Sequence, residues 1–442
     1  MLTLPHSNPK LPSGVCIYRL SGITISLRSL SMRVAVIGCG IIGAAIAYEL
    51  SLVTGLKITV IDQQPPAQGA TGAALGVLMG AISKKVKGRA WQLRKTSLQR
   101  YQTLIPELEA LTGHQIPSNR NGILKLFFPG EDLASWEKLV ETRYSQGWHL
   151  EIWDAAKIRP HCPQLSTDKI IGAIYSPQDG QIEPTALTKT LVAAAALNGV
   201  TFNFGYAVEG VLSRFSDNLN LHTCHHIYTD VGKLEVDWLV VAAGVGSSQL
   251  ITLLQAQLTK VIDEPSATSA MPSYNQEQNN TGALIGNKPT EAMQFSTTPP
   301  LMIKPVLGQA LQLRLEHPIG YGDFQPVITG DDVLIVPVGK GEYWIGATVE
   351  FPNNVGDVVA EPILLEKVRQ QALSFCPALA GAKVIRTWSG KRPRPQGHSA
   401  PIITQLPGYS NVLVATGHYR NGVLLAPATA QAIREIITAA KC

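Results

Sequence analysis

Gly38-Cys39-Gly40-Ile41-Ile42-Gly43 follows a short apolar run at 33–37 and opens a segment of small residues, 43–50, that favours a helix. A strand, the pattern G-x-G-x-x-G and a helix in this order are typical of a dinucleotide-binding turn. The first glycine permits a tight turn, the second lets the backbone approach a pyrophosphate, and the third lets helix and strand pack closely. The amino end of the helix is expected to face the anion.

A second apolar run, 57–61, ends at Asp62, which follows Gly43 by 19 residues. Together with the first run and the helix it predicts the first βαβ unit of a doubly wound sheet. An acidic residue at this place accepts hydrogen bonds from the ribose hydroxyls of the adenosine and disfavours a 2′-phosphate. The sequence therefore predicts a nucleotide other than NADP.

The choice between FAD and NAD rests on the residues after the second strand. Only one complete fingerprint is present, which disfavours a flavin reductase with two nucleotide sites. The run Gly69-Ala-Thr71-Gly72-Ala73-Ala-Leu-Gly76 consists almost entirely of small residues. Such a backbone can lie flat against a bulky group such as an isoalloxazine, which favours FAD. A flexible loop is the alternative interpretation of this run taken alone.

Composition excludes several other classes of protein. The 442 residues carry a formal net charge of +5 with no accompanying Lys/Arg cluster, which disfavours a nucleic-acid partner. No apolar run reaches the roughly 18–20 residues that span a bilayer. The six cysteines are scattered, without C-x-x-C or a metal-like pairing with histidine, so we expect no metal site, no disulfide framework and a cytoplasmic protein.

Two segments differ in composition from the rest. Residues 1–31 contain no Asp or Glu and are rich in serine, which fits either a transit peptide to an organelle or a start assigned upstream of the true one at Met32. We favour the second interpretation, and with either one we expect this segment to be disordered. Residues 259–300 are rich in Ser, Thr, Asn, Gln and Pro, and we predict a disordered insertion because they cannot bury enough apolar surface.

Further motifs are similar to those of the D-amino-acid oxidase superfamily of flavoproteins, and most of all to its glycine oxidase branch. They appear in the family's order over about 32–442: the fingerprint, the Gly-Ala-Thr loop, Ser176-Pro-Gln-Asp-Gly180-Gln-Ile-Glu-Pro184, Val240-Val-Ala-Ala-Gly244, Lys304-Pro-Val-Leu-Gly308-Gln309, Ile345-Gly-Ala-Thr348, Trp388-Ser-Gly-Lys-Arg392-Pro393 and Gly417-His-Tyr-Arg420-Asn-Gly422-Val-Leu-Leu-Ala-Pro427. The last motif is the most specific of them.

That last motif also has a physical interpretation of its own. A glycine-rich loop opens a predicted helix, 424–440, with Pro427 in its first turn, where the missing N–H of proline costs nothing. The positive end of this helix would stabilise the negative charge that develops on the pyrimidine ring of a reduced flavin. An ordinary strand–loop–helix ending is the alternative.

The resemblance implies two substrate-binding arginines and a cofactor site. Arg392 would hold a substrate carboxylate bidentately, and Arg420 is similar to a second active-site arginine of the glycine oxidase branch. The predicted FAD site comprises Gly38, Gly40, Ile41, Ile42, Gly43, Asp62, Thr71, Gly72, Ala73, Gly76, Val208, Gly244, Gly417, Tyr419, Arg420, Asn421, Gly422 and Val423. Nothing marks Cys376 as a covalent attachment point, so we expect non-covalent FAD. For His418 we expect a structural hydrogen bond rather than catalysis.

The substrate site departs from the family pattern in two places. Where the family commonly has Tyr-Ile-Val-Pro-Arg, this chain has Leu334-Ile-Val-Pro-Val338. The family's Thr-Pro-Asp-Gly loop has become Arg394-Pro-Gln-Gly397. A pocket that contains Leu334 should be more apolar than one built for glycine, which puts glycine itself in doubt as the substrate.

We therefore expect an α/β protein that combines a Rossmann-like FAD-binding domain with a mixed-sheet α+β substrate domain. The FAD-binding domain would comprise 32–116, 180–258 and 380–442, and the substrate domain 117–179 and 301–379. The resemblance implies oxidative deamination of a small amine or amino acid by hydride transfer to FAD, with oxygen as acceptor and hydrogen peroxide as product. An amino-acid dehydrogenase with a quinone or carrier acceptor, a flavin-bearing assembly or scaffold protein, and a homo-oligomeric state all remain open.

Overall fold

The computed structural model describes residues 15–20, 23–28, 31–258, 301–353 and 356–440. The predicted insertion at 259–300 and residues 1–14 of the predicted leader lie outside these ranges. Within the leader, β1 (Val15–Leu20) and β2 (Ile23–Arg28) pair as an antiparallel two-stranded sheet, a feature that the composition of the segment did not indicate. Within the described part of the chain, no helix is both long enough and apolar enough to cross a bilayer.

A six-stranded sheet forms the centre of the nucleotide-binding half. Its order is β11-β4-β3-β15-β22-β21, and all neighbours are parallel except β21 with β22. The strands are β3 (Met32–Ile37), β4 (Leu56–Asp62), β11 (Thr201–Phe204), β15 (Trp238–Val241), β21 (Ile402–Gln405) and β22 (Val412–Thr416). The strand at 33–37, the helix after it and the strand at 57–61 thus form the predicted βαβ unit, with the first strand in the middle of the sheet.

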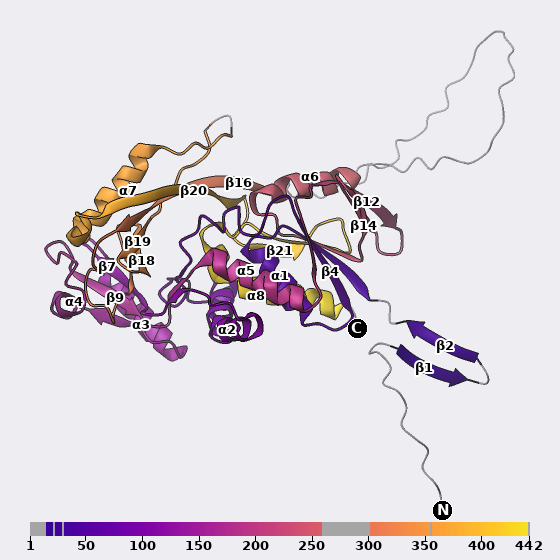
Figure 1. The fold of residues 1–442 in the computed structure, drawn as a ribbon, viewed down its shortest axis with the longest axis horizontal. Coiled ribbons are helices and arrows are strands. Elements are labelled where there is room, and N and C mark those ends of the chain that lie inside the picture. The colour runs from indigo at the N-terminus through magenta and orange to yellow at the C-terminus, as the bar shows by residue number, and fades with distance from the viewer. Residues whose placement is uncertain (1–14, 21–22, 29–30, 259–300, 354–355, 441–442) are drawn as a thin grey trace, which may run out of the picture.

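Helices cover one face of this sheet (Figure 1). They are α1 (Ile41–Ser51), α2 (Gly88–Thr112), α5 (Pro184–Leu197) and α8 (Gly422–Ala439), whose apolar side chains share one core with β3 and β4. The opposite face packs against α6 (Ser247–Leu258) and a small antiparallel sheet of β12 (Val208–Ser216), β13 (Leu221–Thr229) and β14 (Gly232–Glu235). The sheet is therefore covered on both faces, as a parallel sheet requires.

The second half of the molecule is built on an eight-stranded mixed sheet with the order β20-β16-β19-β18-β17-β7-β9-β8. Its strands are β7 (Ile123–Phe127), β8 (Glu151–Trp153), β9 (Gly172–Ser176), β16 (Met302–Arg314), β17 (Val327–Gly330), β18 (Val333–Gly339), β19 (Glu342–Gly346) and β20 (Lys383–Gln396). One face packs on α4 (Ala155–His161) and α7 (Pro362–Phe375). The helix α3 (Leu133–Ser145) contributes Trp136 and Leu139 to the core on the other face. The other face joins the core of the nucleotide-binding half.

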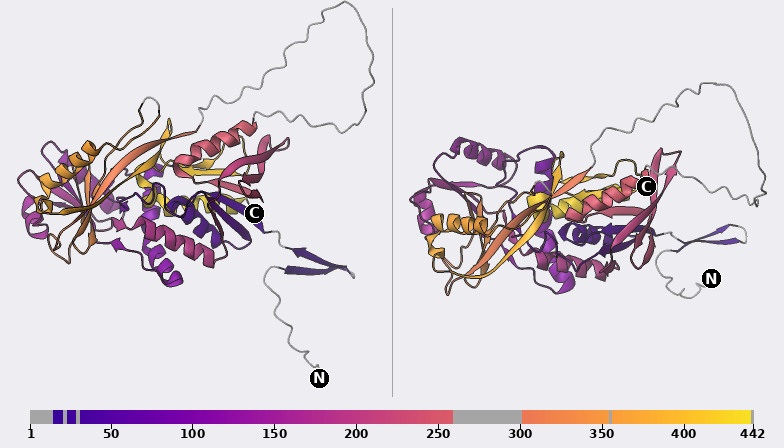
Figure 2. Two further views of the ribbon diagram at one scale, coloured as in Figure 1. Left: turned by 45° about the horizontal axis from the view of Figure 1, so that its top comes forward. Right: turned by 90° about the horizontal axis from the view of Figure 1, so that it is seen from above.

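The longest strands, β16 and β20, run from one half of the molecule to the other (Figures 1 and 2). They pair with each other from Met302 and Gln396 to Arg314 and Lys383. The predicted domain boundary at 380 therefore falls before a strand that belongs to the substrate sheet. A third, three-stranded sheet of β5 (Val77–Leu78), β10 (Gly180–Ile182) and β6 (Ser118–Asn119) also lies between the halves.

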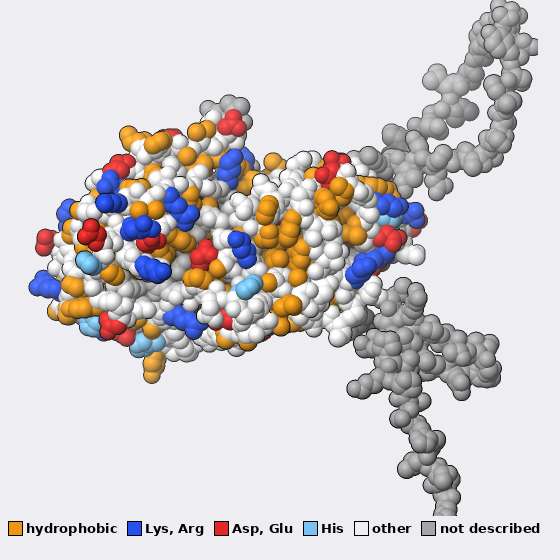
Figure 3. Space-filling model, viewed as in Figure 1, with side chains coloured by type: hydrophobic (Ala, Val, Ile, Leu, Met, Phe, Trp, Pro, Cys, Tyr) orange, Lys and Arg blue, Asp and Glu red, His pale blue; other side chains and the backbone are white. Residues whose placement is uncertain are grey.

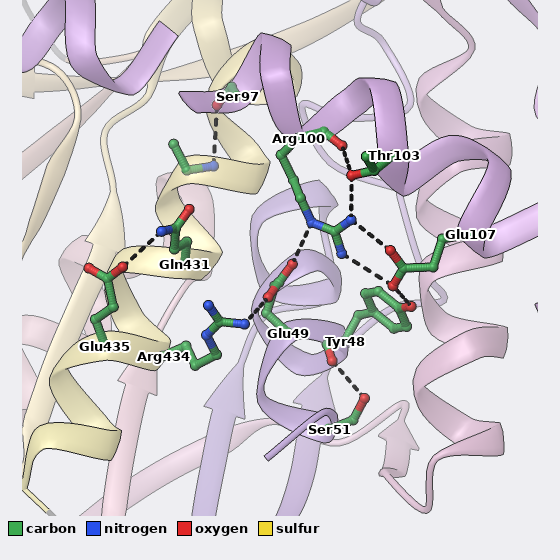
Figure 4. A network of polar contacts seen from close by, with 11 residues as sticks. Tyr48, Glu49, Ser51, Ser97, Arg100, Thr103, Glu107, Gln431, Arg434 and Glu435 are labelled. Atoms are coloured by element: carbon green, nitrogen blue, oxygen red, sulfur yellow. Dashed lines mark hydrogen bonds and ion pairs between the residues drawn. The ribbon is translucent and has the colours of Figure 1, made fainter. Parts of the chain in front are cut away.

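A buried carboxylate ties three of the covering helices together (Figure 4). Glu49 of α1 is 5% exposed and accepts hydrogen bonds from Arg100 Nε of α2 at 3.1 Å and from Arg434 Nη1 of α8 at 2.9 Å. Arg100 also donates to Glu107 at 2.7 Å, which fixes its guanidinium. Because a buried charge without partners is costly, this network specifies how α1, α2 and α8 pack.

The position of Pro427 differs from the prediction. Because α8 begins at Gly422, two residues before the predicted start, Pro427 lies inside the helix instead of in its first turn. A proline there leaves the carbonyl four residues earlier, that of Val423, without its helical donor. The hydroxyl of Tyr101 donates to this carbonyl at 2.5 Å and so replaces the missing N–H. The helix therefore continues through the proline because α2 supplies the hydrogen bond.

Candidate FAD and substrate site

The parallel strands of the six-stranded sheet bring the predicted cofactor residues to one edge. Since β3, β4, β11, β15 and β22 are parallel, their carboxyl ends lie together, which is where α/β sheets bind ligands. The residues that follow these ends are Gly38, Asp62, the segment 205–208 with Val208, Gly244 and Gly417. Segments separated by nearly 400 residues in the sequence thus meet at one place.

Close contacts explain the glycines of the fingerprint. Gly38 has φ +104°, and a Cβ there would lie 2.5 Å from the carbonyl oxygen of Ala242. A Cβ on Gly43 would lie 1.8 Å from the carbonyl oxygen of Gly38, so only glycine permits this turn. Gly40 occupies the N-cap position of α1 and provides no side-chain hydrogen bond, and the first turn of α1 carries no acidic residue. Apart from the N–H of Ile41, whose hydrogen bond Thr71 accepts, the positive end of α1 is therefore open to an anionic ligand, which fits a pyrophosphate.

Asp62 and Thr71 both accept hydrogen bonds from the backbone of the fingerprint turn. Asp62 Oδ2 accepts a hydrogen bond from the backbone N–H of Cys39 at 2.6 Å. Thr71 is buried, and its Oγ1 accepts from the N–H of Ile41 at 3.0 Å. The turn is thus fixed before any ligand binds, and Asp62 stands at the end of β4, where the sequence placed it for the ribose hydroxyls.

The small-residue loop packs tightly against both halves of the molecule. A Cβ on Gly72 would lie 2.3 Å from the carbonyl oxygen of Ala67, and one on Gly76 would lie 1.8 Å from that of Ile182. The indole Nε1 of Trp388 donates to the carbonyl of Ala73 at 3.1 Å, and a Cβ on Gly390 would lie 2.3 Å from the Cβ of Ala73. The loop is therefore an ordered strip between the fingerprint and β20, whereas the flexible-loop interpretation predicts no such contacts.

The C-terminal motif forms a turn at the start of α8. Gly417 and Tyr419 have positive φ values of 70° and 53°. Asn421 is the N-cap residue without a side-chain hydrogen bond to the helix, and the first turn of α8 has no acidic residue. The amino end of α8 thus remains open beside Tyr419, Arg420 and Gly422, with Val423 buried behind them. This arrangement fits the electron-rich pyrimidine end of a flavin.

His418 is a buried structural residue, as its sequence context indicated. Its Nε2 lies 2.9 Å from Thr429 Oγ1, and the Thr429 hydroxyl donates to the Leu425 carbonyl at 2.8 Å. The Thr429 hydroxyl therefore donates its only proton to the Leu425 carbonyl. In the hydrogen bond between His418 and Thr429, the donor is then the Nε2–H of His418 and the acceptor is Thr429 Oγ1. Burial, aided by Arg89, lowers the pKa of His418 to about 3, so the ring stays neutral.

This neutral histidine predicts a loss of stability in acid. The pKa of His418 in the folded protein lies below the ordinary histidine value of 6.5, so the stabilisation is complete above pH 6.5 and declines as the pH falls toward about 3. We expect the wild type to lose about 1.4 kcal/mol per pH unit through this group. Urea unfolding of the wild type and His418→Asn at pH 7, 5.5 and 4.5 measures it. The stability difference between them should shrink as the pH falls, and a constant difference would contradict the assignment.

Arg392 is held from one side of its guanidinium. Its Nη1 donates to the carbonyls of Leu307 at 3.2 Å and Thr348 at 3.0 Å. The side chain lies across β16 at Gly308, where a Cβ would stand 2.0 Å from Nη2. Burial, followed by the charge of Arg420, lowers the pKa of Arg392. Among the described residues neither Nε nor Nη2 donates to a protein acceptor, so one edge of the guanidinium is available to a carboxylate.

A buried polar network positions the second of these carbonyls. Glu350 is 6% exposed; its carboxylate accepts from Gln309 Nε2 at 3.0 Å, from the N–H of Glu361 at 2.8 Å and from the Thr348 hydroxyl. The N–H of Gln309 in turn donates to Thr348 Oγ1 at 2.7 Å. The network fixes Thr348 and through it Arg392. The motifs around Gly308 and Thr348 were visible in the sequence, but their role as supports of Arg392 was not.

Apolar and aromatic side chains line the sheet beside Arg392. Leu334 pairs with Gly346, and Leu75 Cδ1 would lie 3.1 Å from a Cβ on Gly346. Trp344 and Trp388 pack edge to face with centroids 5.8 Å apart. A cavity of about 630 Å³ borders Trp344 and Arg386, while Arg392 and Arg420 do not line it. The Nε1 of Trp344 is buried without a hydrogen-bond partner in the described structure.

Two further observations concern possible metal ligands and Cys376. Among the described residues, no group of three or more His, Cys, Asp or Glu side chains is placed to hold a metal ion. Cys376 is a buried free thiol, and burial raises its pKa to about 12, so it is not a reactive nucleophile.

Comparison with known proteins agrees with this geometry. The family model described as "FAD dependent oxidoreductase" matches residues 33–279 and 279–436. The chain therefore belongs to the FAD-dependent oxidoreductase family of D-amino-acid oxidase and glycine oxidase, and FAD is its cofactor. The α/β fold and the presence of an FAD-binding Rossmann-like domain are thereby confirmed.

Individual relatives are distant but similar over most of this chain. A glycine oxidase of Bacillus licheniformis is 28% identical over 91% of this chain and 92% of its own length. The bifunctional protein ThiO/ThiG of Trichormus variabilis is 28% identical over 92% of this chain, which spans only 53% of that protein. A crystal structure of glycine oxidase from Geobacillus kaustophilus superposes with a TM-score of 0.72 at 23% identity and covers 92% of this chain and 95% of that one.

Proposed function

We propose that this protein oxidises the C–N bond of a small amine or amino acid that binds between the eight-stranded sheet and the FAD. The supporting observation is Arg392, a half-buried arginine with one free edge and no carboxylate partner among the described residues. A planar guanidinium in such a place is suited to the bidentate binding of a substrate carboxylate. Glycine oxidases among the relatives support the choice of amine.

FAD would supply the chemistry by accepting a hydride from the substrate α-carbon. The protein's own residues would bind, orient and dehydrate the substrate. Arg392 and Arg420 would hold the carboxylate, while Leu334, Leu75, Trp344 and Trp388 would exclude water from the reacting carbon. His418, buried against Thr429 with its pKa near 3, does not act as a base. A substrate amine that arrives neutral requires no base from the protein.

The site favours substrates other than glycine. Leu334 replaces the tyrosine hydroxyl that the family pattern places beside the substrate, and its side chain packs with the apolar core instead. An aliphatic wall makes apolar contacts with the carbon atoms of a substituent, and glycine has no substituent to make them. We therefore propose an amino acid with a side chain or an N-substituent, with oxygen as acceptor and hydrogen peroxide as product.

Anaerobic mixing of the yellow holoenzyme with amines tests this function. We expect glycine, sarcosine and the D- and L-amino acids to differ, with one class bleaching the flavin band and glycine reacting at least tenfold more slowly than the best member. One peroxide per turnover in air would identify an oxidase, whereas reduction without peroxide would identify a dehydrogenase that uses a quinone or carrier. A flavin that no amine bleaches would contradict the proposed function and favour a structural role for the flavin.

A further inference from the structure

Arg394, two residues after Arg392 on β20, points across β16 in the same direction as Arg392. Side chains two residues apart on a strand share one face of the sheet. Arg392 reaches over Gly308 to the carbonyl of Thr348, and Arg394 places its guanidinium 5.2 Å from the ring centroid of Phe351, three residues further along the same segment. Both arginines therefore lie side by side over one stretch of chain, 348–351.

A lysine faces Arg394 from the neighbouring strand. Lys304 of β16 is the register partner of Arg394 of β20, so the two side chains stand on the same face of the sheet. Cross-strand neighbours have Cβ atoms about 5 Å apart, and like charges at such positions destabilise a sheet. Both side chains are exposed, and neither forms an ion pair with any carboxylate of the described chain.

A third cation meets Arg394 from the C-terminal motif. The guanidinium of Arg394 lies 5.7 Å from the ring centroid of Tyr419, and that of Arg420 lies 5.6 Å from the same centroid. Arg420 is also close enough to Arg392 for its charge to lower the pKa of Arg392. Arg392, Arg394, Arg420 and Lys304 thus form one group, which we call the cation cluster.

Some arginines elsewhere form ion pairs, whereas the exposed Arg89, Arg120, Arg159, Arg214 and Arg386 form none with the described carboxylates, as is the case for Arg394. Arg314 lies 2.5 Å from Glu342, and Arg33 lies 2.8 Å from Asp237. On the face drawn in Figure 3, blue Lys and Arg side chains are interspersed with red Asp and Glu. The carboxylate nearest the cation cluster in the network above is Glu350, which is buried and already accepts hydrogen bonds from Gln309, Thr348 and Glu361.

We propose that the cation cluster binds a second carboxylate of the substrate, so that the preferred substrate is an amine with two carboxylates. This inference rests on the proposed function and adds a specificity residue to it. Arg392, with Arg420, would hold the carboxylate next to the reacting carbon, and Arg394, with Lys304, would hold the other. An anion between the cations would relieve the repulsion between Lys304 and Arg394, and Tyr419 would keep the two exposed guanidiniums apart.

Binding of unreactive acids to the FAD-loaded protein tests the subsite without turnover. Malonate and succinate would be compared with acetate and propionate through the change that each causes in the visible flavin spectrum. We expect the better dicarboxylate to bind at least tenfold more tightly than its monocarboxylate partner, and the preference to weaken with added salt. Arg394→Gln should reduce the preference to about threefold or less and leave the binding of acetate unchanged.

Lys391→Gln is the matched control. Lys391 is an exposed cation of the same strand, but its odd position places it on the opposite face from Arg392 and Arg394. This variant should bind every acid as the wild type does. If Lys391→Gln lost the dicarboxylate preference as fully as Arg394→Gln, the loss would be due to the change in net charge alone. That result would overturn the proposal. So would a wild type that binds malonate and succinate no better than acetate and propionate.

Reduction of the flavin by substrates separates this inference from the proposed function. D-Aspartate and iminodiacetate would be compared with D-alanine and sarcosine, which carry one carboxylate each. Arg394→Gln and Lys304→Gln should lower kcat/KM for the dicarboxylates about tenfold and change that for the monocarboxylates less than twofold. Rapid reduction by monocarboxylates alone would overturn the inference and keep the proposed function. Tight malonate binding with no reduction by any amine would contradict the proposed function and keep the anion subsite.

Discussion

Replacement of Arg392 by alanine is expected to lower kcat/KM for the best amino-acid substrate about a thousandfold while FAD stays bound. The substrate carboxylate would lose its charged partner in a partly buried site, and the loss of one member of such a pair costs ~3–5 kcal/mol. FAD should remain because Arg392 contacts Leu307 and Thr348 of the substrate sheet and no residue of the glycine turns. The rate of anaerobic flavin reduction at low substrate concentration measures the effect.

Two further variants make this result specific. Arg392→Lys keeps the charge but loses the planar fork, so it should recover only part of the rate. Lys391→Ala removes an adjacent cation that points to the other face of β20 and should leave kcat/KM within twofold of the wild type. Unchanged kcat/KM in Arg392→Ala would show that the carboxylate binds elsewhere.

Local chemistry at the ends of strands allowed the cofactor half of the fold to be predicted. The glycines of the fingerprint and Asp62 are fixed by contacts within one βαβ unit, such as the hydrogen bond from Cys39 to Asp62. Parallel pairing then brings Gly244 and Gly417 to the same edge of the sheet, which the order of buried strands already implies. These residues are close in space because each stands at or just after the carboxyl end of a parallel strand. Each of those strands can be recognised from its own residues.

The features that sequence reasoning missed depend on contacts between distant segments. The sequence groups 383–396 with the FAD-binding segments, because the pairing of β20 with β16 over this whole range cannot be recognised from its own residues, which include prolines and charged side chains. Pro427 was placed in a first turn because nothing near it in the sequence indicates that Tyr101 replaces its missing donor. Nothing in its local sequence distinguishes Arg394 from a surface arginine, because Lys304 and Tyr419, which lie beside it, come from distant parts of the chain.

Replacement of Gly43 by alanine is expected to give a colourless protein with lowered stability. The new Cβ would lie 1.8 Å from the carbonyl oxygen of Gly38, and this backbone atom cannot move without changing the turn. Forced overpacking of this kind costs about 1–3 kcal/mol, and we expect the upper end because α1 and β3 are both buried. The displaced turn would no longer present the amino end of α1 to the pyrophosphate, so the FAD dissociation constant should rise about a hundredfold. Visible absorbance and FAD titration of the purified variant measure both effects.

Gly381→Ala is the control, because no atom lies within 4 Å of a Cβ at that position and its φ is not positive. A yellow Gly43→Ala protein with normal FAD affinity would show that the cofactor does not depend on this turn.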